Sequence, residues 1–153
     1  MKRLISLILA VLTIVLMFPA VTAYAAQDEV LEEIIWLDND SYIKVTTQTI
    51  STYASGTVTK SKSYTCYTGD DAQWEITLNG TFTYNGVTST CTSSSCDVSI
   101  YNSTNWYVVS KSANKSGNTA TATATIGYRV LGITTRKDTY DLTLTCDKNG
   151  NVS

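Results

Sequence analysis

Acidic side chains are the main candidates for catalysis in this sequence, because it contains no histidine. Without histidine, the Ser-His-Asp, Cys-His and His-metal arrangements cannot be built. A pair of carboxylates could still hydrolyse a glycosidic bond, and the candidates are Asp70, Asp71 and Glu75. Asp70 and Asp71 follow Gly69, however, in a pattern typical of a turn. The sequence therefore favours a non-catalytic protein, and we expect no catalytic residue and no cofactor.

Two short segments carry oxygen ligands at spacings that suit calcium. Asp147, Asn149 and Asn151 alternate as they do at the start of an EF-hand loop, and residues 38–40 form a second cluster. Gly150 stands fourth rather than sixth in the first segment, and no closing glutamate follows it. The two segments would meet in space only if the first and last strands were neighbours. Both have ordinary turn composition, so we expect turns and no metal site.

Aromatic rings are the remaining candidates for ligand binding. Sandwich domains that bind sugars often present tryptophan and tyrosine as platforms, which is an analogy at the level of the fold. Trp74 and Phe82 fit the pattern of a core strand. Trp36 lies near the N-terminal end, and one ring of the Trp106-Tyr107 pair must point outward if the strand alternates. Trp36, Trp106 and Tyr107 are therefore the candidate ligand-binding residues, and aromatic cross-strand pairs are the alternative.

Residues 1–25 have the pattern of an export signal peptide. Lys2 and Arg3 precede an apolar run from Leu4 to Phe18, which is short for a membrane span. Small residues at positions 23 and 25 then form a cleavage site. We expect cleavage after residue 25 and secretion, with no membrane insertion afterwards.

Acidic residues outnumber basic ones once the leader is removed. Loss of Lys2 and Arg3 leaves nine basic and 13 acidic residues, which gives a net charge of −4. A basic patch is the usual footprint of nucleic-acid binding. This balance argues against nucleic acid and against binding anionic membranes by charge alone. The expected partner is an extracellular glycan or protein.

The segment "GNTATATATIGY", from Gly117 to Tyr128, alternates alanine with threonine. A period of two places the alanines at positions 120, 122 and 124 on one face of a strand. Packed interiors do not tolerate the space that three small side chains leave, so bulky residues must face them. The threonines then face water or threonines of a neighbouring strand. The candidates for the bulky residues are Trp74, Phe82, Tyr84, Trp106 and Val108.

Similar β-rich runs recur from Ser41 onward, about every 8 to 14 residues, with glycine, asparagine or serine between them. Asn85-Gly86 predicts a type I′ hairpin, and Asn79-Gly80 predicts a bulge or a tight turn. No helical pattern separates the runs. We therefore predict an all-β protein with an antiparallel β-sandwich of about 7–9 strands, immunoglobulin-like or Greek-key, as one domain over residues 41–153.

Residues 26–40 are expected to form an N-terminal lead segment before that domain. Val30, Leu31, Ile34 and Leu37 have helical spacing, which favours a short amphipathic helix. An irregular segment that docks on the sheet is the alternative, and the mixture of Ile34, Ile35 and Trp36 also suits a strand.

The four cysteines are Cys66, Cys91, Cys96 and Cys146. An even number in an exported chain predicts two disulfides. Four cysteines allow three connectivities, and the sequence alone does not choose among them.

Three segments, "GTFTYNGVTSTCT", "SANKSGNTATATAT" and "LTLTCDKNGNVS", lie in the second half of the chain. Through them the chain resembles an uncharacterised family of small, signal-peptide-bearing secreted proteins of Gram-positive gut bacteria. The resemblance implies a bacterial source and a secreted β-sandwich, and it supplies no activity and no catalytic residue. It implies the disulfide Cys91–Cys146, which leaves Cys66–Cys96 as the other pair.

These observations together predict a secreted, non-catalytic β-sandwich protein that acts as an extracellular binding module for a glycan or a protein partner. One alternative is a bacteriocin-like or effector protein that acts on other cells. A second alternative is a small carboxylate-dependent enzyme of the glycosidase kind.

Overall fold

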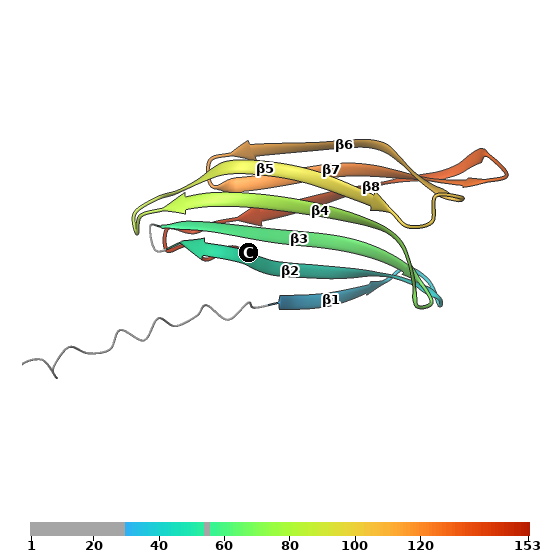
Figure 1. Ribbon diagram of the computed structural model, residues 1–153, viewed down its shortest axis with the longest axis horizontal. Helices are drawn as coiled ribbons and strands as arrows, with labels where there is room; N and C mark the ends of the chain where they lie inside the picture. The colour runs from blue at the N-terminus through green and yellow to red at the C-terminus, as the bar shows by residue number, and fades with distance from the viewer. Residues whose placement is uncertain (1–29, 54–55) are drawn as a thin grey trace, which may run out of the picture.

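The computed structural model describes residues 30–53 and 56–153, and this part of the chain is all-β (Figure 1). The predicted signal peptide, residues 1–25, lies outside the described residues. No helix of the described part is long and apolar enough to cross a membrane. The strands are β1 (Val30–Trp36), β2 (Ser41–Tyr53), β3 (Thr57–Thr68), β4 (Asp71–Tyr84), β5 (Ser89–Ile100), β6 (Trp106–Ser116), β7 (Thr119–Val130) and β8 (Ile133–Thr145).

Two antiparallel meanders form the two layers of the sandwich. The larger sheet has the order β1-β2-β3-β4-β5, and the smaller has the order β6-β7-β8. The connection between β5 and β6 passes from one sheet to the other (Figure 1). The predicted antiparallel β-sandwich and its strand number are confirmed. The immunoglobulin-like or Greek-key order is not formed, because strands that are neighbours in each sheet also follow one another in sequence.

The segment before Ser41 is part of the larger sheet. β1 pairs with β2 along its whole length, from Val30 to Trp36. The short helix is therefore wrong and the strand alternative is correct, so Val30–Trp36 belongs to the larger sheet. Ile34 and Ile35 are β-branched, and pairing with β2 outweighs the helical spacing of the apolar residues.

The alanine face of β7 lies in the core, as predicted. The alanines at positions 120, 122 and 124 are at most 1% exposed. Threonines on the other face bond to the neighbouring strands, and some of them bond to side chains of β8. Thr123 donates to the carboxylate of Asp141 at 2.6 Å, and the hydroxyls of Thr125 and Thr139 lie 2.9 Å apart. The alternation therefore separates a packed face from a hydrogen-bonded face.

Small residues also let the two sheets approach closely near Ala120. A Cβ placed on Gly80 of β4 would lie 2.8 Å from a ring carbon of Phe82 and 3.1 Å from the Cβ of Ala120. Gly80 is therefore needed because a side chain at this position would not fit between Phe82 and Ala120. β4 continues through Asn79 and Gly80, so no tight turn forms there, and a bulge lies beside them between Thr81 and Phe82.

The β4–β5 hairpin lies at the predicted place but has a different turn. Gly86 has a φ of +83°, whereas Asn85 is not among the residues with positive φ, so the type I′ pair is not formed. The loop instead covers residues 85–88. The Asn85 Oδ1 accepts the backbone N–H groups of Val87 and Thr88 at 3.0 and 2.9 Å, which closes the loop as an Asx turn.

All four cysteines are free thiols, so the structure contains neither predicted disulfide, Cys91–Cys146 nor Cys66–Cys96. Cys66 is opposite Trp74 and Cys96 is opposite Leu78, on the two sides of β4. Four residues along a strand and two strand spacings separate the Cα atoms of Cys66 and Cys96 by about 16 Å. A disulfide needs a Cα separation below about 7 Å, so this pair cannot form without a change of fold.

Cys91 and Cys146 each make a bond to the backbone instead of to each other. The Cys91 thiol donates to the carbonyl of Ser93 at 3.2 Å, and the Cys146 thiol donates to the carbonyl of Asp147 at 3.3 Å. Burial raises the pKa of both thiols, which keeps them protonated at neutral pH.

Candidate ligand-binding pocket

The three predicted ligand-binding residues lie in three different places. Trp36 is on the outer face of the larger sheet, because its neighbour Ile35 lies opposite the buried Ile43. Trp106 packs on the core residue Trp74, between the sheets. Tyr107, the next residue, therefore lies on the outer face of the smaller sheet. The structure does not bring the three rings together into one site.

Trp36 begins a row of aromatic rings that crosses β1, β2 and β3. It is 64% exposed, and its ring lies 5.2 Å from that of Tyr42. Tyr42 in turn stacks on Tyr67 at 5.0 Å, with an angle of 11° between the planes. The tyrosines therefore turn one face toward each other and do not form a flat platform. A ligand could stack on this row mainly at the exposed ring of Trp36.

Tyr107 is held by contacts within its own sheet. Its hydroxyl lies 2.6 Å from the hydroxyl of Thr134, and the guanidinium of Arg129 lies 5.6 Å from its ring centre. The ring also covers Gly127, where an added Cβ would lie 2.3 Å from a ring carbon. These contacts give Tyr107 a packing role on the smaller sheet.

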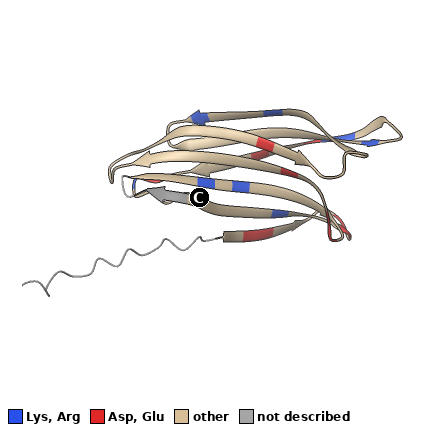
Figure 2. Ribbon diagram, viewed as in Figure 1, with Lys and Arg blue, Asp and Glu red and all other residues tan. Residues whose placement is uncertain are grey.

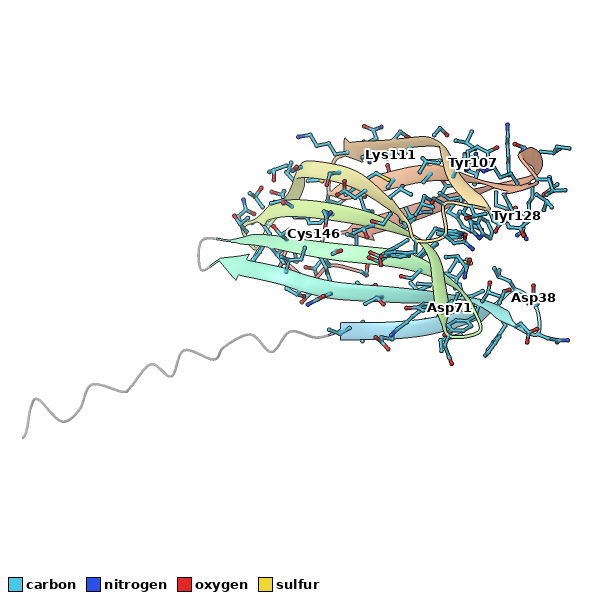
Figure 3. The ribbon with its side chains drawn as sticks, turned by 45° about the vertical axis from the view of Figure 1, so that its right-hand side comes forward. Asp38, Asp71, Tyr107, Lys111, Tyr128 and Cys146 are labelled. Carbon is cyan, nitrogen blue, oxygen red and sulfur yellow. The ribbon has the colours of Figure 1, made fainter. Side chains whose placement is uncertain are left out.

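Trp106 lines a pocket of about 480 Å³ at one end of the sandwich. Ligand pockets in proteins measure about 300–1,000 Å³, so this one is large enough for a small molecule. Figure 3 shows Asp38, Asp71 and Tyr128 toward this end, and Cys146 lies toward the other. The lining residues are Asp38, Ser41, Thr68, Asp71, Gln73, Asn102, Asn105, Trp106, Tyr128 and Arg136.

The buried side chain of Gln73 connects two walls of the pocket. Gln73 is the extra residue of a bulge in β4, because Trp74 pairs with Cys66 while Ala72 pairs with Tyr67. Its Nε2 donates to the carbonyl of Asp71 at 2.9 Å, and its Oε1 accepts from Asn102 at 2.9 Å. The bulge therefore turns an amide toward the β5–β6 connection and fixes that connection beside the pocket.

The connection between β5 and β6 is also fixed at its other end. The amide of Asn105 donates to the carbonyl of Arg129 at 3.1 Å, and the backbone N–H of Arg129 donates to the carbonyl of Asn105 at 2.8 Å. The Arg129 guanidinium donates to the carbonyls of Ser103 and Thr104 at 2.9 and 3.2 Å. The asparagines that line the pocket thus stand on a loop with a defined conformation.

Aromatic rings form the apolar part of the lining. Trp106 and Tyr128 lie 4.7 Å apart at an angle of 57°. Behind them Trp74 is fully buried and packs edge-on against Trp106, with ring centres 6.2 Å apart. The Nε1 of Trp74 has no hydrogen-bond partner among the described residues, so packing alone holds this ring. Trp106 and Tyr128 are therefore presented to the pocket on a rigid base.

Charged groups give the pocket an excess of negative charge. Asp38 and Asp71 line it together with one cation, Arg136, which is ion-paired with Asp138. The Asp38 carboxylate accepts the backbone N–H groups of Asp40 and Ser41 at 3.0 and 2.7 Å. The bond from Asp40 is the largest cause of a lowered pKa for Asp38, with smaller contributions from Ser41 and Arg136. Asp38 is therefore ionised at neutral pH.

The three carboxylates that were candidates for glycoside hydrolysis do not share a cleft. Asp70 is an exposed turn residue, and Asp71 lines the pocket. Glu75 accepts bonds from Thr65 and Tyr101, both at 3.3 Å, on the outer face of β4. A glycosidase needs a general acid of raised pKa beside a second carboxylate. Asp38, the other acid of the pocket, has a pKa shifted in the opposite direction.

The two candidate calcium segments lie at opposite ends of the sandwich. Residues 38–40 belong to the β1–β2 turn beside the pocket, whereas the C-terminal segment contacts the β4–β5 loop through a bond from Gly86 to Lys148. The Asp147 carboxylate accepts bonds from Asn149 and Asn151 at 2.8 to 2.9 Å. Both segments form turns, as predicted, and they do not meet.

Most of the pocket was missed by reasoning from the sequence. Tyr128 continues the period of the Ala-Thr strand beyond Ile126, and this placed it on the core side without indicating a pocket. Gln73, Asn102 and Asn105 carry no local signal, because their position depends on a bulge and on a connection between sheets. Arg136 reaches the pocket only because β8 follows β7 in the smaller sheet.

Comparison with known proteins gives no match: no family model, no curated protein and no solved structure is similar to this chain. A function must therefore be inferred from the chemistry of the pocket.

Proposed function

We propose that this protein is a secreted, glycan-binding protein and that the pocket at the β1–β2 end is its sugar site. The observation that carries the proposal is the joint presence of the Trp106–Tyr128 ring pair and several amide and hydroxyl side chains around a volume of about 480 Å³. The predicted export signal supports a location outside the cell.

Sugars need two kinds of contact from a protein. Each hydroxyl group donates and accepts hydrogen bonds, which suits the amides of Asn102 and Asn105 and the carboxylate of Asp71. The C–H face of a sugar ring is apolar and packs against an aromatic ring. Trp106 and Tyr128 offer such a surface beside the polar groups. The pocket therefore combines both requirements within the span of one or two sugar units.

The charge of the pocket favours a neutral ligand over an anionic one. Two carboxylates line it, and the guanidinium of Arg136 is already paired with Asp138. A phosphate or a sulfated sugar would meet like charges at Asp38 and Asp71. Neutral polysaccharides are therefore the expected ligands, and strongly acidic ones are not.

Binding to insoluble polysaccharides, followed by tryptophan fluorescence, tests this proposal. Protein purified from the culture medium is mixed with neutral polysaccharides and with bacterial cell walls, and the bound fraction is measured after centrifugation. A soluble oligosaccharide from a binding polysaccharide is then titrated. We expect a saturable change in emission, because Trp106 lines the pocket.

Two matched substitutions locate the site. Trp106→Phe keeps an aromatic ring and removes the reporter, so the fluorescence response should disappear and binding should weaken. Trp36→Phe makes the same change on the outer face and should leave both intact. Asp71→Asn should weaken binding about 10-fold, because one charge-assisted hydrogen bond contributes about 1.5–3 kcal/mol. Loss of binding in Trp36→Phe alone, or no binding across the panel, would overturn the proposal.

A further inference from the structure

β1 is an edge strand whose apolar residues are exposed on both faces. Trp36 is the most exposed of them at 64%, and Ile35 is the least exposed at 42%. Every residue of β1 is exposed, and its hydrogen-bonded neighbour is β2. The apolar residues of this segment are Val30, Leu31, Ile34, Ile35, Trp36 and Leu37.

The smaller sheet does not cover the inner face of β1. Leu31, Glu33 and Ile35 share the face of the buried Val45 and Ile43 of β2. The contacts between the sheets join β3, β4 and β5 to strands of the smaller sheet. The larger sheet therefore extends beyond the smaller one on the side of β1, as Figure 1 shows.

The two edge strands of the smaller sheet, β6 and β8, carry several charged residues. β6 carries Lys111 and Lys115, and β8 carries Arg136, Lys137 and Asp138. Such residues discourage a further strand from pairing at an edge. On β1 the charges are Glu32 and Glu33, which appear as one acidic band between apolar residues (Figure 2). Glu32 is already paired with Lys44 at 2.7 Å.

We infer that β1 pairs antiparallel with β1 of a second copy of this chain, about a two-fold axis at Ile34. A two-fold interface uses the same surface on both partners, and an antiparallel strand can meet its own copy in this way. The pairing places Ile34 opposite Ile34, Leu31 opposite Leu37, Glu32 opposite Trp36 and Glu33 opposite Ile35. Within residues 31–37, apolar residues then meet one another or a glutamate, and no two carboxylates lie directly opposite.

The self-complementary sequence is the reason to choose a second copy as the partner. An axis one residue earlier would place Glu33 directly opposite Glu33, which is unfavourable across a sheet. The axis at Ile34 avoids this and brings the leucines at positions 31 and 37 together on the uncovered inner face. The dimer joins the two larger sheets into one continuous sheet, with the smaller sheets on the same side.

Sedimentation equilibrium over a wide range of protein concentration tests the dimer. We expect a monomer–dimer equilibrium for the wild-type protein. Ile34→Lys places two ammonium groups opposite each other at the axis and should abolish the dimer while the far-ultraviolet circular dichroism stays unchanged. Val87→Lys is the matched control, because Val87 is 78% exposed in the β4–β5 loop, and its dimer should equal that of the wild type.

A cross-linking pair tests the register. Ile34→Cys places two Cα atoms about 4.5–5.5 Å apart across the axis, within the range for a disulfide. Glu32→Cys places them about 14 Å apart, beyond that range. With a mild oxidant, Ile34→Cys should give a covalent dimer, whereas Glu32→Cys and the wild type should not. A monomer at every concentration, a dimer that persists in Ile34→Lys, or equal cross-linking of the two cysteine variants would overturn the inference.

Discussion

Gly80→Ala tests the close approach of the two sheets. The added Cβ would lie 2.8 and 2.9 Å from two ring carbons of Phe82 and 3.1 Å from the Cβ of Ala120. Ordinary carbon contacts are about 3.5–4.0 Å, so the methyl group must displace a buried ring or a strand. Overpacking of this kind costs about 1–3 kcal/mol. Alanine is favoured over glycine in a strand by about 0.5–1 kcal/mol, so we expect a net loss of about 1–2 kcal/mol.

Chemical denaturation of a double-mutant cycle measures this loss and its cause. Phe82→Leu removes the ring carbons nearest the new methyl group, so the cost of Gly80→Ala should be smaller in the Phe82→Leu background. Residues in contact show a coupling of about 0.5–3 kcal/mol. A neutral or stabilising Gly80→Ala, or costs that add within about 0.5 kcal/mol, would refute the packing described for Gly80.

Three further predictions concern the two faces of β7, the buried groups and Tyr107. Ala122→Thr buries a hydroxyl in the core and should lower the free energy of unfolding by more than 2 kcal/mol, whereas Thr123→Ala on the bonded face should cost about 1 kcal/mol or less in the same urea titration. Burial raises the pKa of Cys66 to about 11, so the free energy of unfolding should fall as the pH rises from about 9 through 11, and Cys66→Ala should reduce this fall; an unchanged pH profile would contradict it. Tyr107→Phe removes the 2.6 Å contact with Thr134 and should lower stability by about 1 kcal/mol without changing polysaccharide binding.

The periodic parts of the fold could be predicted from the sequence. The alternation in β7 defines two faces wherever the strand is placed, so the buried alanines and the paired threonines followed directly. The segment of β1 was ambiguous, because Val30, Leu31 and Ile34 fit a helical spacing as well as a strand. The segment is a strand because it pairs with β2, and a pattern within the segment itself does not show such a pairing.

The pocket could not be predicted, because it joins residues from the turns and connections of both sheets. Trp106 and Tyr107 were both candidates because one of two adjacent rings in a strand must point outward. Of the two, Trp106 lines the pocket and Tyr107 does not. The bulge at Gln73 could not be predicted, because no residue type or spacing around it indicates an extra residue in the strand. The prediction of disulfides was wrong for a similar reason. The number of cysteines does not show that β4 lies between Cys66 and Cys96.

The unequal sizes of the two sheets give rise to both proposed sites. Five strands face three, so β1 extends beyond the smaller sheet and keeps a free edge. The turn that follows β1 supplies Asp38 and Ser41 to the pocket, at the end where the β5–β6 connection crosses between sheets. An antiparallel pair of β1 strands reverses the direction of one copy, so the two pockets would lie on opposite sides of the two-fold axis and face opposite directions along the strands. A dimer of this kind presents its sugar sites away from each other, which suits bridging two separate polysaccharide chains better than gripping one.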